Sequence, residues 1–163
     1  MFRPIALLSA VVAVSLTATG CATLLSSEHR TEDYTPLFAL ASAGDVTAVQ
    51  AAIAQDRSAL AATEWDHATL LHVAVQQNQL ELTQALIGDG AGVNALTDDH
   101  LTPLHMAAQN GNVTISRLLL EHGAEINALD LKGWTPLDRA EKWQHPLTAT
   151  FLRASGGKEA GQL

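Results

Sequence analysis

The stretch that decides the fold is LTPLHMAAQNGNVTISRLLLEHGAEINA, residues 101–128. It contains two short runs rich in apolar residues, separated by the turn-forming sequence Asn-Gly-Asn. Thr102 and Pro103 suit the first turn of a helix, because a Thr hydroxyl can accept from the free N–H groups there and Pro has no N–H to lose. Gly123 can adopt the left-handed backbone that ends a helix. The stretch therefore predicts two short helices joined by a turn.

This unit recurs along the chain. Thr and Gly residues repeat with a step of 33: Thr69, Thr102 and Thr135, then Gly90, Gly123 and Gly156. A looser copy begins at Thr35, offset by 34. One such helix pair cannot bury its own apolar face, so it must stack against neighbours. We predict four units, at about 30–62, 63–95, 96–128 and 129–157.

These units resemble ankyrin repeats, and the third, TPLHMAAQNGNVTISRLLLEHGAEIN at residues 102–127, is close to the family pattern. The resemblance implies an all-α ankyrin-repeat solenoid of about four helix-turn-helix units with short hairpin loops. It also implies that His72 and His105 form structural hydrogen bonds that tie adjacent units together.

The sequence departs from the family pattern at several positions. Phe38 and Asp138 stand where His is usual, and Leu70 replaces Pro. His67 and His100 stand at a loop position that is usually Gly, and we expect them to enter the left-handed backbone region at some cost.

The N-terminus resembles an export signal. Arg3 is followed by an apolar run over residues 5–16, which is shorter than the roughly 20 residues that a spanning helix needs. The segment ends in Ala-Thr-Gly-Cys, which resembles a bacterial lipoprotein signal. In that family the Cys sulfur, here on Cys21, receives a diacylglycerol, and the signal is cut before it. Ala18 departs from the usual Leu, so ordinary secretory cleavage is the alternative.

These motifs predict an order of segments and a location. Residues 1–20 are a lipoprotein signal peptide that is removed, residues 21–33 a tether, residues 34–157 ankyrin repeats, and residues 158–163 a disordered tail. Several acyl chains would anchor the chain firmly. Because no Asp follows Cys21, the family's sorting rule implies the outer membrane, facing the periplasm. A soluble periplasmic protein is the alternative.

Composition limits the classes of function. The 163-residue chain has a net charge of −8, which repels nucleic acid and favours a basic partner. Aromatic residues make up 4%, which suits packing from Ala and Leu. There is no phosphate-binding loop, no nucleophile motif and no cluster of residues with metal-ligand spacing. We therefore expect no enzyme activity, no cofactor and no metal.

The resemblance also implies where a partner binds, at the loop tips and late in the first helices. The loop positions are Trp65, Asp66, Ala68, Asp98, Asp99, Leu101, Leu131, Lys132 and Trp134, and Tyr34 takes the same place in the first unit. The helix positions are Gln76, Gln77, Gln109, Asn110, Lys142 and Trp143. All three tryptophans fall here, and Trp and Tyr dominate binding energy at interfaces. We predict an aromatic, acidic face for a partner with a basic, partly apolar patch. The alternative is that the tryptophans cover neighbouring loops or cap the stack.

The predicted function is thus a non-enzymatic protein-protein interaction module. It would be monomeric and lipid-anchored at the periplasmic face of a bacterial envelope membrane. One alternative is an immunity or inhibitor lipoprotein that neutralises a toxin or hydrolase. Another is an unrecognised enzyme or metal binder that uses the histidines.

Overall fold

The computed structural model describes residues 34–163, which form four helix pairs. The pairs are α1 (Thr35–Ala43) with α2 (Val46–Gln55), α3 (Leu70–Gln76) with α4 (Leu80–Gly88), α5 (Pro103–Gln109) with α6 (Val113–Glu121), and α7 (Pro136–Lys142) with α8 (Pro146–Ala154). Two 3₁₀ helices complete this part of the chain, η1 (Arg57–Ala61) and η2 (Ala160–Gln162). Between residues 34 and 163 the only β pairing is an isolated bridge between Thr63 and Thr69, and no strand forms, so the predicted all-α repeat fold is confirmed. The predicted signal peptide, tether and Cys21 lie outside the described residues.

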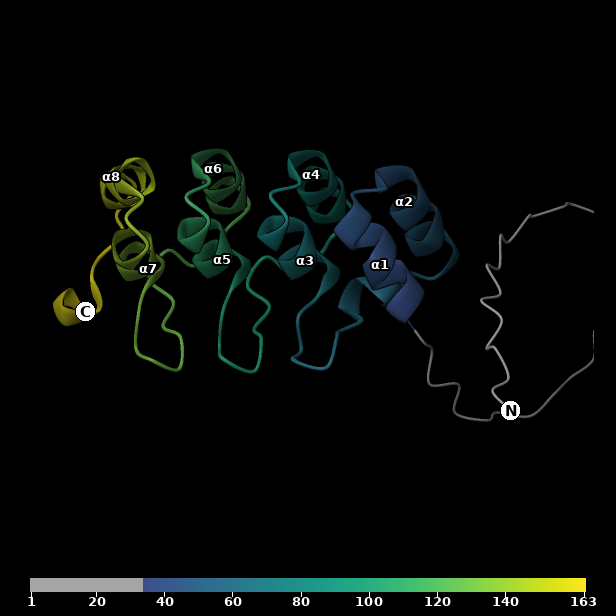
Figure 1. Cartoon of the computed structure of the whole chain (residues 1–163), viewed down its shortest axis with the longest axis horizontal. Coiled ribbons are helices and arrows are strands. Elements are labelled where there is room, and N and C mark those ends of the chain that lie inside the picture. Colours follow the sequence, from purple (N-terminus) through teal and green to yellow (C-terminus); the bar gives the residue numbers. More distant parts are fainter. Residues whose placement is uncertain (1–33) are drawn as a thin grey trace, which may run out of the picture. The chain divides into compact units, whose positions relative to one another are not determined.

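The helices stack in two rows (Figure 1). The first helix of each pair packs against the first helix of the next pair, from α1 to α7, and the second helices follow the same order from α2 to α8. The looser first unit also folds as a complete helix pair, with Phe38 buried at the position where the next two units carry His.

Thr and His residues explain why α3 and α5 begin where they do. The hydroxyl oxygen of Thr102 accepts a hydrogen bond from the backbone N–H of His105, at 3.3 Å. In return the backbone N–H of Thr102 donates to Nδ1 of His105, at 3.1 Å. This reciprocal capping satisfies two N–H groups that a helix start would otherwise leave free. Pro103 then occupies the first turn without losing a hydrogen bond.

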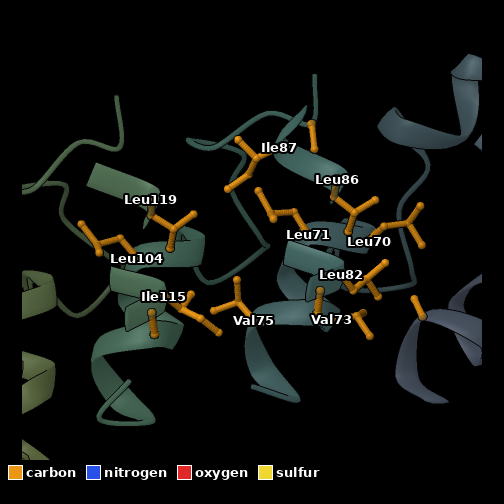
Figure 2. Close-up of a cluster of buried hydrophobic side chains, with 14 of the residues drawn as sticks. Leu70, Leu71, Val73, Val75, Leu82, Leu86, Ile87, Leu104, Ile115 and Leu119 are labelled. Atoms are coloured by element: carbon orange, nitrogen blue, oxygen red, sulfur yellow. The ribbon is translucent and has the colours of Figure 1, made fainter. Parts of the chain in front are cut away.

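The core between the rows is built from Leu, Ile, Val and Ala. Figure 2 shows side chains from α3, α4, α5 and α6 that meet there, among them Leu71, Leu86 and Leu119, all at most 1% exposed. Ala107 and Ala108 on α5 are fully buried, and their small side chains let neighbouring helices come close. Packing from Ala and Leu is therefore confirmed. Most of the stability comes from this buried apolar surface.

The loops take the backbone conformations that the sequence predicts. His67 and His100 have φ angles of 58° and 57°, and Gly133 at the corresponding place has 72°. Gly123, which follows α6, has a φ angle of 84°. The histidines therefore occupy a region that normally favours Gly.

The prediction of a disordered tail at residues 158–163 is wrong. The tail folds back beside α7 (Figure 1), where the carbonyl of Lys158 accepts from Thr135 Oγ1 at 2.8 Å. The N–H of Ala160 donates to Asp138 at 3.0 Å, and the N–H of Lys158 donates to Asn127 at 2.8 Å. The tail thus supplies hydrogen-bond partners for the capping residues of the fourth unit, Thr135 and Asp138.

Candidate partner-binding surface

Three loops form a continuous edge along the array. They are residues 64–68, 97–101 and 130–134, hereafter the loop edge, and they project from the row of first helices (Figure 1). Each loop is closed by a backbone hydrogen bond of 2.9–3.1 Å between its first and last residues. Neighbouring loops are joined as well, because Asp98 donates to the carbonyl of Asp66 at 2.9 Å and Leu131 to that of Asp99 at 3.0 Å. The edge is therefore one connected surface.

Two buried histidines hold the loop edge to the helices. Nε2 of His72 lies 3.0 Å from the carbonyl oxygen of Leu101, and Nε2 of His105 lies 3.1 Å from that of Trp134. Because Nδ1 accepts from a Thr N–H in each case, Nε2 carries the proton and donates. Burial lowers the pKa of both imidazoles, so they are neutral at pH 7. Their predicted structural role is confirmed.

The last unit replaces this histidine with Asp138. Its carboxylate accepts from the N–H of Thr135 at 2.8 Å, which completes the same capping pattern. It also accepts from the N–H of Ala160 in the tail, at 3.0 Å. In the earlier units the His ring donates to the loop of the next unit, whereas in the fourth unit Asp138 accepts a hydrogen bond from the tail.

Trp65 and the aspartates occupy the first two loops of the edge. Trp65 is 90% exposed, the largest exposed fraction among the big apolar side chains of the described residues. Asp98 lies 2.6 Å from Nδ1 of His67, a pair that is well exposed, and Asp99 is exposed. The carboxylate of Asp66 accepts from the N–H of Ala68 at 3.0 Å and stabilises its own turn. Trp65, Asp98 and Asp99 are therefore the groups best presented to a partner here.

The other two tryptophans lie together in the fourth unit. The ring centroids of Trp134 and Trp143 are 6.1 Å apart in an edge-to-face arrangement. The guanidinium of Arg139 lies 5.9 Å and 5.5 Å from these two rings, and Nζ of Lys132 lies 5.4 Å from the ring of Trp134. Such cation–π contacts stabilise both partners. The arrangement agrees with the alternative that these two tryptophans cap the stack, and it surrounds them with positive charge.

A buried ion pair beneath this cluster is absent from the sequence predictions. Arg139 contacts Asp130 through Nε at 2.9 Å and Nη2 at 2.6 Å, and both residues are at most 6% exposed. The other carboxylate oxygen of Asp130 accepts from the N–H groups of Lys132 and Trp134, at 2.8 and 3.0 Å. Burial alone would raise the pKa of Asp130, but these hydrogen bonds and the charge of Arg139 outweigh it and hold the pKa below its usual value.

A comparison between repeats contains the signal for this pair. Thr97 and Met106 stand 33 residues before Asp130 and Arg139. One step along the array therefore changes two positions together, from a neutral pair to an oppositely charged one. The second unit has an acid without a base at these places, Glu64 with Val73, so it is the presence of both opposite charges in the fourth unit that indicates contact.

The predicted helix positions divide between exposed and internal roles. Gln76 and Gln77 are exposed, and Trp143 is 40% exposed. Gln109 accepts from Nη1 of Arg139. Asn110 donates from Nδ2 to the carbonyls of Val75 at 3.2 Å and Gln76 at 2.9 Å, so its amide ties two units together. Asn110 is thus a structural residue, whereas the two glutamines are accessible.

Two further residues that were predicted to contact a partner, Tyr34 and Leu101, form hydrogen bonds within the array. The hydroxyl of Tyr34 donates to Asp56 at 2.8 Å and ties the start of α1 to the segment before η1. Leu101 is half-buried, and its carbonyl is the one that accepts from His72. Leu131, by contrast, is 61% exposed on the loop edge.

Charge is divided unevenly along the array. Residues 34–128 carry two basic and ten acidic side chains, a balance of −8. Residues 129–163 carry five basic and four acidic side chains, a balance of +1. The exposed acids of the predicted aromatic, acidic face, Asp98 and Asp99, therefore lie in the acidic part of the array. Trp65 lies with the acidic loops, while Trp134 and Trp143 lie with Lys132 and Lys142.

A model of the family described as ankyrin repeats (3 copies) matches residues 10–97 and 71–161. The chain belongs to the ankyrin repeat family. No curated protein matches it. Ankyrin repeats typically act as non-enzymatic domains that bind another protein, so this chain is a protein-protein interaction module.

Residues 34–163 hold no group of three or more His, Cys, Asp or Glu side chains arranged to bind an ion. Among the helices of the same residues, none combines the length and hydropathy needed to span a bilayer.

Proposed function

We propose that this ankyrin repeat chain is a lipid-anchored interaction module at the periplasmic face of a bacterial outer membrane, and that the acidic part of the loop edge binds a basic, partly apolar patch of another protein. The lipid would be carried by Cys21. The observation that carries the binding proposal is Trp65, a large apolar side chain that is 90% exposed on a fixed loop.

The physical argument rests on what Trp65 and its neighbours offer. A buried Trp at the centre of an interface is among the most costly residues to truncate. Asp98 and Asp99 lie on the adjacent loop, which the backbone bond to Asp66 holds in place. Since the loops are already joined, little conformational entropy is lost on binding. A partner with Lys or Arg around an apolar pocket complements these groups.

The binding proposal is tested by affinity capture from a cell-envelope extract with the full-length chain. Trp65→Ala should weaken capture of the specific partner roughly thirtyfold or more. Leu147→Ala is the matched control, because Leu147 is 78% exposed but lies on α8, away from the loop edge. Asp98→Asn with Asp99→Asn should weaken capture further at low salt. Equal capture by the wild-type chain and Trp65→Ala, with the fold intact by circular dichroism, would reject this surface.

The anchor is tested separately. Growth with a labelled fatty acid should label the wild-type chain, and Cys21→Ser should remove the label. A labelled wild-type chain that sediments with the outer membrane supports the proposal. No label on the wild-type chain would instead support ordinary secretory cleavage and a soluble periplasmic protein.

A further inference from the structure

The fourth unit carries a second exposed surface with the opposite charge. It consists of Lys132, Trp134, Lys142 and Trp143, hereafter the basic–tryptophan patch. Nζ of Lys132 and Nζ of Lys142 lie 5.4 Å and 5.9 Å from the ring of Trp134. Trp143 packs edge-to-face on the same ring and keeps 40% of its surface exposed.

Both lysine charges are available to a ligand. Arg139 beneath the rings is neutralised by Asp130, in a pair that is buried on both sides. Within residues 34–163 neither Lys132 nor Lys142 forms an ion pair with a carboxylate, and both are exposed. The patch therefore presents two uncompensated ammonium groups beside two aromatic rings.

The patch is also held in one geometry. The buried carboxylate of Asp130 accepts from the N–H groups of Lys132 and Trp134, at 2.8 and 3.0 Å. The carbonyl of Trp134 in turn accepts from His105 of the preceding unit, at 3.1 Å. The backbone that carries the patch thus needs no reordering when a ligand binds, which favours affinity.

We propose that the basic–tryptophan patch binds an acidic segment of a partner protein that also carries an apolar side chain. Carboxylates of the segment would contact the two ammonium groups, and its apolar side chain would pack on the exposed face of Trp143. This inference rests on the proposed function, because it extends the same interface. It concerns a different set of residues and a ligand of opposite charge.

The position of the patch favours a short acidic segment over a nucleic acid or an anionic membrane. The neighbouring loop carries Asp98 and Asp99, and it is joined to the patch loop by the 3.0 Å bond from Leu131 to Asp99. An extended anionic surface that reached the lysines would also lie near these carboxylates and would be repelled by residues 34–128, whose net charge is −8. A protein segment can place its negative charge on the patch alone.

The two surfaces together fix how a partner lies on the array. Its basic patch would face the second and third units, and its acidic segment would face the fourth. Reversal of the partner would bring like charges together at both ends, which costs free energy. Opposite charges at the two ends therefore give the interface a direction.

The proposal is tested with a short synthetic peptide of glutamates around one phenylalanine, added to the full-length chain in detergent at low salt. We expect a change in tryptophan fluorescence that saturates and weakens with added salt. Lys132→Glu with Lys142→Glu should weaken binding roughly tenfold or more. Lys158→Glu is the matched control, since Lys158 is exposed and lies outside the patch. Circular dichroism checks that each variant is folded.

Three results would overturn the proposal. They are no binding of the peptide to the wild-type chain, equal binding by the double variant, or patch-dependent binding to vesicles of anionic phospholipid without binding to the peptide. Trp65→Ala should leave the affinity for this peptide unchanged. A failure of the acidic loops to bind a partner is therefore distinguished from a failure of the patch.

Discussion

Replacing Asp130 with Thr should destabilise the fourth unit strongly. Asp130 is the acceptor for Nε and Nη2 of Arg139, whose side chain is only 7% exposed. Removal of one partner from a buried ion pair costs about 3–5 kcal/mol, because the remaining charge is left without compensation. Arg139 keeps its contacts to Gln109 and the two tryptophan rings, so we expect a loss near the lower end, about 3 kcal/mol.

Thr is chosen because the third unit carries it at the same place. There Thr97 accepts from the N–H of Leu101 through its hydroxyl, at 3.1 Å. A Thr at position 130 can form the equivalent bond, so the variant mainly removes the charge. The double variant Asp130→Thr with Arg139→Met reproduces the residues of the third unit, and it should recover most of the loss.

Urea unfolding followed by two signals measures this effect. Tryptophan fluorescence reports chiefly on Trp134 and Trp143 in the fourth unit, and circular dichroism reports on all helices. Asp98→Ala is the control, because it removes the hydrogen-bonded contact with His67, whose two side chains are more than half exposed, and should cost less than about 1 kcal/mol. A loss below about 1 kcal/mol for Asp130→Thr, or a double variant no more stable than the single one, would refute the reasoning.

Three further changes test other contacts. Deletion of residues 158–163 should destabilise the chain by about 1–3 kcal/mol in urea unfolding, because Thr135 and Asp138 lose their partners, whereas deletion of residues 161–163 should cost little. Gly111→Ala and Gly133→Ala both place a side chain at positive φ, which costs about 1–2 kcal/mol of stability each. Only the new side chain at position 111 would also overlap the ring of His145, so the melting temperature of Gly111→Ala should be clearly lower than that of Gly133→Ala. The two loop-tying histidines have lowered pKa values in the fold, so the unfolded chain takes up protons first as the pH falls below about 6.5. The free energy of unfolding should therefore decrease from about pH 7 to about pH 5, and an unchanged urea midpoint over this range would contradict the role of the neutral rings.

The repeat fold was predictable because its signals are local and recur. A Thr cap, a buried His and a turn Gly return every 33 residues, and each acts within its own unit or on the next. The left-handed backbone at His67 and His100 followed from the same alignment of units. Periodicity therefore predicted the fold, the loops and the role of His72 and His105.

The details of the surface were less predictable, because they depend on contacts between different elements. The Asp130–Arg139 pair joins a loop to a helix, and the tail is ordered by groups on α7 and on the preceding loop. The place of a residue in the repeat pattern also did not predict whether its side chain is exposed or bonded within the array. Gln76 and Asn110 both occupy variable helix positions, yet Asn110 binds the backbone of the unit before it.

The exchange of His for Asp138 has a consequence for how such an array can grow. In a unit with His, the ring N–H donates a hydrogen bond to a loop carbonyl of the next unit, so such a unit can be followed by another. The fourth unit offers a carboxylate, which a loop carbonyl would repel and which the N–H of Ala160 satisfies. Duplication of a unit could lengthen this protein upstream of Thr135 without disturbing its end. Addition of a unit directly after α8 would require Asp138 and the tail to change together, because the two are joined by the hydrogen bond from Ala160.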